Sequence, residues 1–184
     1  PLPVDRSKLR SFIVVGPGDI LDAAKYPWGW ETLDFDDSSW KEVSTLGRGV
    51  PYGVRNFSVQ WQLVPRPIPL MEDTPQRFDK IVRYNFRVGD NFIRGKGVLN
   101  FAKNTHFTIL IDQGHLTTAY PQLLLSKGKG TKITITYAEA LKDSSGQKGH
   151  RDKIDGKEII GYQDEFLPDG GDNRLFSTLW FRTF

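Results

Sequence analysis

The sequence of 184 residues contains no cysteine and only one methionine. Without cysteine, the chain cannot form disulfides, thiolate metal sites or a cysteine nucleophile. It also lacks the G-x-S-x-G elbow of many hydrolases and the G-x-x-x-x-G-K phosphate loop. Its three histidines do not have the spacing of zinc ligands. These absences exclude several common enzyme classes.

Long hydrophobic runs are missing as well. No apolar stretch approaches the roughly 20 residues that cross a bilayer, so we expect no membrane span. The first residues, Pro1 to Arg6, do not resemble a signal peptide and include no Met. We therefore expect that the chain begins after processing or is excised from a longer protein.

The charge balance shows no strong excess of one sign. The 25 Lys and Arg residues exceed the 22 Asp and Glu residues by three, and the two signs are interleaved from Arg6 to Arg182. Proteins that bind nucleic acid usually gather basic residues into one patch. The sequence therefore predicts no nucleic-acid partner.

Alanine, the best helix former, occurs only six times, whereas there are 5 Trp, 6 Tyr and 12 Phe residues. Aromatic residues favour strands, and 18 Gly and 11 Pro provide many turns. Apolar residues alternate most clearly in 132–137, and similar patterns occur in 107–111, 160–166 and 175–184. Weaker strand candidates are 81–88 and 123–125. Asp164 stands out because it shares a face with Ile160, Tyr162 and Phe166.

Glycine-rich turns separate these strands, for example at 127–130 and 169–172. This spacing predicts an all-β fold: an antiparallel β-sandwich of jelly-roll type, concanavalin-like or galactose-binding-like. We expect one domain over 1–184, with a lead-in at 1–70 and the main sandwich at 71–184. The lead-in ends in a Pro-rich connector at 65–69 that must be extended.

Two polar segments are candidates for chemistry. The first, at 34–40, contains three Asp residues that could bind calcium, but the favoured interpretation is a turn closed by Asp and Ser with Phe35 and Trp40 packed beneath it. The second is the long loop 142–157, flanked by Glu139 and Asp164. Long loops within compact domains are often functional. Carboxylates and Arg forks suit a sugar ligand, and a solvated basic loop is the alternative.

The order of motifs resembles the N-terminal β-sandwich region of bacterial alpha-L-rhamnosidases, of glycoside hydrolase family 78 and particularly the Bacteroides type. The resemblance covers about four-fifths of the chain. It rests on the order of these groups of residues: Trp30 with 34–40, the Pro-rich link at 64–70, Asp112-Gln113-Gly114, a Leu-rich strand followed by Gly128 and Gly130, Tyr137 to Leu141, Gly146 to Asp152, Tyr162 to Leu167, Gly170-Gly171, and Phe176 to Phe184.

This resemblance implies an inverting glycoside hydrolase whose acid and base lie on a separate, downstream barrel of helices. We therefore expect no catalytic residue in this chain, and whether the chain is itself an enzyme stays open. The partners implied are that barrel in the same polypeptide and a rhamnose-containing glycan. The location implied is periplasmic, extracellular or at the cell surface.

Related sandwiches bind L-rhamnose with calcium through the loop after the Ala-Glu strand. The candidate glycan site here is therefore Glu139, His150, Arg151, Asp152 and Asp164. No metal site is expected, and Asp152 is the calcium candidate in this loop. His150 stands where the family has Asn, and His is a poor calcium ligand.

The function predicted is a non-catalytic accessory domain that supports the barrel and can bind glycan. Two alternatives remain. One is a purely structural sandwich without a ligand. The other is a self-contained jelly-roll glycosidase or lyase that uses Glu139 and Asp164.

Overall fold

The computed structural model describes residues 18–55 and 61–184, and within these ranges the protein is all-β, with eleven strands and no helix. No helix of the described chain could therefore cross a membrane. The strands are β1 (Ile20–Asp22), β2 (Val50–Pro51), β3 (Gln62–Leu63), β4 (Lys80–Tyr84), β5 (Ile109–Asp112), β6 (Thr118–Ala119), β7 (Gln122–Leu125), β8 (Ile133–Tyr137), β9 (Tyr162–Leu167), β10 (Arg174–Ser177) and β11 (Arg182–Thr183).

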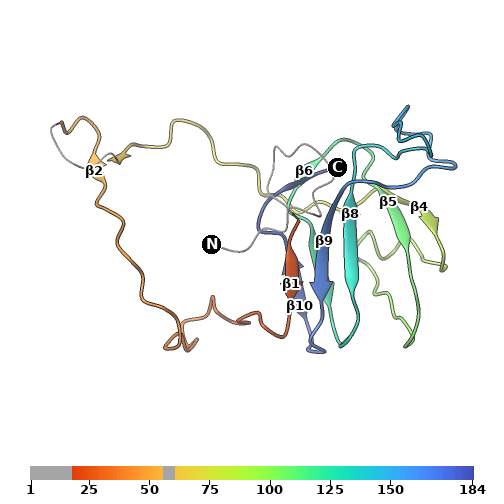
Figure 1. Cartoon of the computed structure of the whole chain (residues 1–184), viewed down its shortest axis with the longest axis horizontal. Coiled ribbons are helices and arrows are strands. Elements are labelled where there is room, and N and C mark those ends of the chain that lie inside the picture. The colour runs from red at the N-terminus through yellow and green to blue at the C-terminus, as the bar shows by residue number, and fades with distance from the viewer. Residues whose placement is uncertain (1–17, 56–60) are drawn as a thin grey trace. The chain divides into compact units, whose positions relative to one another are not determined.

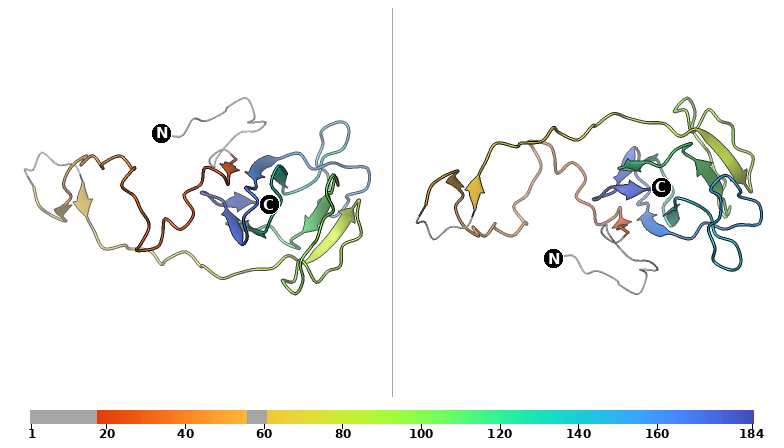
Figure 2. Two further views of the ribbon diagram at one scale, coloured as in Figure 1. Left: turned by 90° about the horizontal axis from the view of Figure 1, so that it is seen from below. Right: turned by 90° about the horizontal axis from the view of Figure 1, so that it is seen from above.

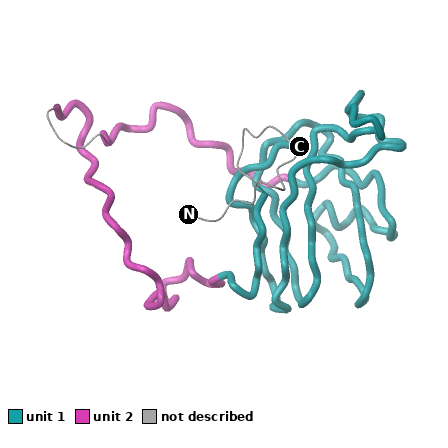
Figure 3. The backbone as a smooth tube through the Cα atoms, viewed as in Figure 1, with its two compact units in different colours: residues 1–26, 77–184 teal, residues 27–76 magenta. Residues whose placement is uncertain are grey.

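The chain divides into two compact units, which Figure 3 colours separately. Of the described residues, the first unit holds 18–26 and 77–184, and the second holds 27–55 and 61–76. The lead-in expected over 1–70 is therefore split. Strand β1 belongs to the strand-rich unit, because it pairs with β9.

The central sheet of the strand-rich unit has the order β1-β9-β8 (Figure 1). Strands β8 and β9 pair antiparallel over their whole length, from Ile133 opposite Phe166 to Tyr137 opposite Tyr162. Strand β1 instead pairs parallel with β9, which the antiparallel expectation did not include. A Cβ at Gly18 would collide with the Gln163 carbonyl, so only glycine lets the chain enter this pairing so closely.

Three further antiparallel pairs complete this unit: β10–β7, β11–β6 and β4–β5. The predicted strands at 81–88, 107–111, 123–125, 132–137 and 160–166 all correspond to observed ones. The predicted final strand, 175–184, is interrupted between β10 and β11. Within this gap the Leu179 N–H donates to the Asp19 carboxylate instead of to a neighbouring strand.

The core is aromatic. Phe166 of β9 and Phe176 of β10 are both buried, with ring centroids 5.3 Å apart, so the central sheet contacts the β10–β7 pair. Tyr137 is buried against Phe184, with centroids 5.7 Å apart. The alternation in 107–111 and 132–137 predicts one buried apolar face on each strand. Of the six side chains on these faces only Tyr137 is buried; the other five are half-buried, namely Phe107, Ile109, Ile111, Ile133 and Ile135.

The second unit has little regular structure of its own. Strands β2 and β3 form a short parallel pair, and most of the apolar side chains around them are exposed. The 34–40 segment is a turn, as the favoured interpretation predicted. The Ser38 N–H donates to Asp36 at 3.0 Å, the Trp40 N–H donates to the Asp37 carbonyl at 2.8 Å, and Phe35 and Trp40 have ring centroids 5.5 Å apart.

Candidate functional site

The candidate site begins with the long loop that leaves β8 and returns to β9. Its base is a two-way backbone bridge: Lys142 N–H donates to the Glu158 carbonyl at 2.9 Å, and Glu158 N–H donates to the Lys142 carbonyl at 2.8 Å. Both views of Figure 2 show this loop beside the β4–β5 pair. The sixteen-residue segment is therefore closed at its base like a hairpin, so its polar residues are held in place.

Asp143 organises the first half of the loop. One carboxylate oxygen accepts hydrogen bonds from the Ser145 hydroxyl at 2.7 Å and from the N–H groups of Ser145 and Gln147, both at 2.9 Å. The Ser145 hydroxyl in particular, and the Gln147 N–H next, hold the pKa of Asp143 below its usual value. The Asp143 carboxylate therefore stabilises the turn through hydrogen bonds to nearby backbone and side-chain groups.

Arg83 of β4 anchors the second half. Its guanidinium donates to the carbonyls of Lys157 at 2.8 Å and Ile154 at 2.6 Å. The Lys157 ammonium in turn donates to the Lys148 carbonyl at 2.8 Å. Sequence reasoning did not find Arg83, because an Arg in a strand gives no signal that it reaches a loop more than seventy residues away.

The predicted loop residues pair with each other and with β5. Arg151 lies 3.5 Å from Asp112, at the end of β5, and 3.6 Å from Asp152. His150 lies 3.7 Å from the second oxygen of Asp152, and Glu139 lies 3.4 Å from Lys148. The structure thus brings three of the five predicted residues, His150, Arg151 and Asp152, into one exposed charged cluster, whereas Glu139 pairs separately with Lys148.

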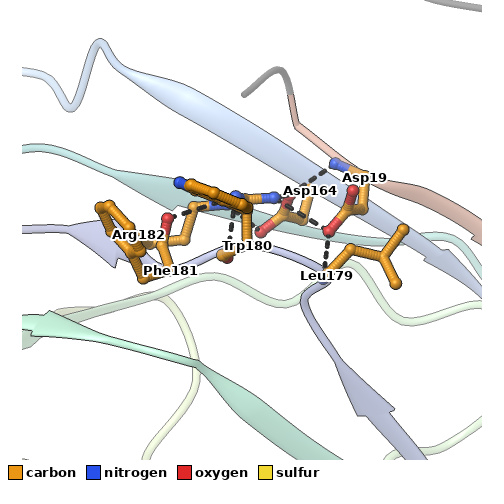
Figure 4. Close-up of polar contacts among 6 residues, drawn as sticks. All are labelled: Asp19, Asp164, Leu179, Trp180, Phe181 and Arg182. Carbon is orange, nitrogen blue, oxygen red and sulfur yellow. Dashed lines mark hydrogen bonds and ion pairs between the residues drawn. The ribbon is translucent and has the colours of Figure 1, made fainter. Parts of the chain in front are cut away.

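Asp164 lies elsewhere, in the interior (Figure 4). It is completely buried, and Arg182 of β11, 1% exposed, pairs with it through two bonds of 2.6 and 3.0 Å. Asp19 joins the pair: its backbone N–H donates to Asp164 at 2.7 Å, and its carboxylate accepts from Arg182 at 3.0 Å. Among the described residues, no hydrogen bond or ion pair connects Asp164 with Glu139 or the loop.

The remaining groups of this buried network are almost all satisfied. The third guanidinium nitrogen of Arg182 donates to the Trp180 carbonyl at 3.0 Å, and the Leu179 N–H donates to Asp19 at 2.8 Å. Burial opposes the charge on Arg182, but the hydrogen bonds to Asp164 and the charge of that carboxylate raise its pKa overall. The odd Asp on the apolar face of the 160–166 strand is therefore explained by a cation that the sequence pattern could not identify.

Two buried side-chain oxygens of the described residues, the hydroxyls of Tyr137 and Thr178, lack a hydrogen bond of good geometry. The Tyr137 hydroxyl lies near Asp164. Burial, followed by the nearby negative charge of Asp164, raises the pKa of this phenol well above its ordinary value.

The charged loop does not fit a calcium ion. Calcium takes six to eight oxygen ligands, whereas Asp152, the candidate ligand, faces the cationic side chain of Arg151 and a ring nitrogen of His150. Within residues 18–55 and 61–184, no group of three or more His, Asp or Glu side chains could hold a metal ion. The chemistry open to this cluster is ion pairing and hydrogen bonding.

Comparison of the chain with protein-family models, curated proteins and solved structures finds no match. The functional conclusion therefore rests on the sequence pattern and on the geometry described above.

Proposed function

We propose that this chain is a non-catalytic accessory domain of an alpha-L-rhamnosidase, a β-sandwich of jelly-roll type that supports a downstream catalytic barrel. The sandwich interpretation is supported by the contact of Phe166 with Phe176, which joins two sheets through their inner faces. The parent enzyme would act in the periplasm or outside the cell.

The supporting role is inferred from the charged side chains, which pair with each other inside the domain. The deepest carboxylate, Asp164, has both oxygens occupied by Arg182 and Asp19, and it has no exposed surface to offer a substrate. A glycosidase needs two accessible carboxyl groups on either side of the sugar bond. Among the described residues, Glu139 and Asp164 do not form such a pair, so the geometry favours a domain without its own chemistry.

Glycan binding at the charged loop is the second candidate, and one observation favours it. The side chains of His150 and Asp152 are 65% and 70% exposed, so a ligand could reach them. A sugar would, however, have to compete with the ion pairs between Arg151, Asp112 and Asp152.

Two measurements test the proposal. The isolated chain should not hydrolyse an aryl alpha-L-rhamnoside beyond the rate of a buffer blank. In the parent polypeptide, identified from its flanking sequence, removal of this domain should lower the melting temperature of the catalytic barrel. Hydrolysis by the chain alone, or flanking sequence that encodes no such barrel, would overturn the proposal.

A further inference from the structure

The sequence contains two Asp-Gly pairs, Asp155-Gly156 and Asp169-Gly170. Both lie in the strand-rich unit, and both glycines have a positive φ, of 66° and 92°. Glycine has no side chain to shield its backbone nitrogen, so this nitrogen can attack the carboxyl group of a preceding Asp. The two pairs share this local chemistry, but the fold treats their carboxyl groups differently.

The Asp169 carboxylate is fully engaged. Arg174 donates to one oxygen at 2.7 Å and to the other at 3.2 Å, and the Gly171 N–H donates at 2.8 Å. These bonds, that of Arg174 foremost, hold the pKa of Asp169 below its usual value, so the protonated acid is rare. A Cβ at Gly170 would lie 3.0 Å from the Lys129 side chain, so this peptide is also closely packed.

Asp155 has none of these restraints. It is exposed, and within the described chain its carboxylate makes no hydrogen bond or ion pair. The Gly156 N–H donates to no described residue, and a Cβ at Gly156 would meet no atom within 4 Å. The two groups that would react are therefore both accessible.

Asp155 and Gly156 are the central residues of the turn that anchors the long loop. The Lys157 N–H donates to the Ile154 carbonyl at 3.2 Å, which closes the turn. Arg83 donates to the carbonyls of both end residues, at 2.6 Å to Ile154 and 2.8 Å to Lys157. The anchoring by Arg83 thus depends on the length of main chain between these two carbonyls.

We propose that Asp155 is a site of spontaneous conversion to isoaspartate. The Gly156 nitrogen forms a bond to Cγ of Asp155, a C–O bond of the carboxyl group breaks, and one water leaves with the amide proton. Water then adds to the resulting cyclic succinimide. Cleavage of the bond between Cγ and nitrogen restores Asp155, whereas cleavage at the main-chain carbonyl carbon leaves isoaspartate. Water is the only co-reactant, and the proposal does not depend on the proposed rhamnosidase parent.

The conversion should loosen the long loop. Isoaspartate carries the main chain through its side chain, which adds one methylene carbon between Ile154 and Lys157. The two carbonyls can then no longer both keep their present positions relative to Arg83. We expect amide hydrogen exchange to quicken over 142–157 in the converted protein, while β8 and β9 stay protected.

The test follows both Asp-Gly pairs in the whole chain during incubation at neutral pH and physiological temperature. Electron-transfer fragmentation of proteolytic peptides locates isoaspartate, whose mass equals that of aspartate. We expect isoaspartate to form about tenfold faster at Asp155 than at Asp169, because the bonds of Asp169 to charged and backbone donors must break first. In the chain unfolded by urea, the two sites should convert at similar rates, because only the fold distinguishes them.

Two variants separate the contributions. Arg174→Met frees the Asp169 carboxylate, so isoaspartate should form several-fold faster at Asp169 and at an unchanged rate at Asp155. Asp155→Glu keeps the charge but would have to close a larger, less favourable ring. Loop exchange in Asp155→Glu should therefore stay constant during the incubation. Urea denaturation establishes that both variants are folded.

Contrary results overturn the proposal in distinct ways. If the folded chain converts Asp155 no faster than Asp169, while the unfolded chain converts both, the turn held by Arg83 prevents ring closure and the proposal is wrong. If Arg174→Met leaves the rate at Asp169 unchanged, the carboxylate bonds are not what protects that site. If isoaspartate forms at Asp155 but exchange over 142–157 does not quicken, the loop does not depend on the length of this turn.

Discussion

The strand-rich unit has two charged regions, the buried network around Asp164 and the charged loop. They differ in how far their charged side chains are removed from water. In the buried network, Asp164 and Arg182 have almost no exposed surface, and their bonds are 2.6–3.0 Å long. In the charged loop, the ion pairs of Arg151 and His150 span 3.5–3.7 Å at the surface. The same residue types thus hold the fold together in one place and remain accessible in the other.

The two compact units differ in a related way. The strand-rich unit buries Phe166, Phe176 and Tyr137, whereas the second unit leaves Leu33, Val43 and Leu46 almost fully exposed. Apolar residues alone therefore do not produce a core. The strand-rich unit has long paired strands to cover them, and β2 and β3 are only two residues each.

The largest effect should follow removal of the buried cation. Arg182→Met leaves Asp164 charged and buried without its partner, and we expect a loss of about 3–5 kcal/mol in the free energy of unfolding. Urea denaturation followed by tryptophan fluorescence measures it. Arg174→Met is the matched control, because Arg174 pairs with Asp169 in a more exposed position, with side chains 27% and 16% exposed. A loss below 1 kcal/mol for Arg182→Met would mean that the network is not buried.

A smaller effect should follow release of the long loop. Arg83→Ala removes the hydrogen bonds to the Lys157 and Ile154 carbonyls, and we expect a loss of about 1–2 kcal/mol. Hydrogen exchange should quicken at the amides of 142–157 while those of β8 and β9 stay protected. Arg151→Ala, which removes only surface ion pairs, should change exchange much less. Equal exchange in the two variants would contradict the anchoring role of Arg83.

The strands were predictable because their signals are local. Alternation of Ile133, Ile135 and Tyr137 with polar residues predicted β8, and the Gly-rich turns predicted where neighbouring strands end. The parallel pairing of β1 with β9 was not predictable, since Ile20 and Glu165 lie far apart in sequence and no turn links them.

The site was predictable only in part for the same reason. His150, Arg151 and Asp152 are consecutive, so the sequence alone placed them together. Asp164 could be recognised as an anomaly, but nothing in the sequence distinguishes Arg182 from the other basic residues as its partner. Composition and periodicity report which face a residue lies on, whereas a buried ion pair depends on contacts between distant strands.

A modest gain should follow removal of the unpaired hydroxyl in the core. Tyr137→Phe deletes a buried polar atom without a partner, and we expect the protein to become about 1 kcal/mol more stable at pH 7. A loss of stability instead would mean that the hydroxyl bonds to Asp164. Tyr84→Phe, at an exposed position, is the control and should change stability little.

The pH dependence of the same variant adds a second readout. Burial raises the pKa of the Tyr137 phenol in the folded protein, whereas an unfolded tyrosine ionises near its ordinary value of about 10. Above that pH the unfolded state loses the proton first, so the stability of the native protein falls as pH rises. The fall between pH 9 and pH 11, measured by urea denaturation, should be smaller in Tyr137→Phe. If stability falls equally in the native chain and in Tyr137→Phe, groups other than Tyr137 cause the pH dependence.

The smallest effect should follow a change in the exposed loop. Asp152→Ala removes partners of Arg151 and His150, but both pairs are at the surface and longer than 3.5 Å, so we expect a loss below about 0.5 kcal/mol. The melting temperature of the variant should be nearly that of the native chain. Calorimetry with methyl alpha-L-rhamnopyranoside should show no binding to either protein. If the native chain binds this rhamnoside and Asp152→Ala weakens the binding tenfold or more, the loop is a sugar site. If instead the melting temperature falls as far as in Arg182→Met, the loop is as structural as the buried network, and the contrast between the two charged regions fails.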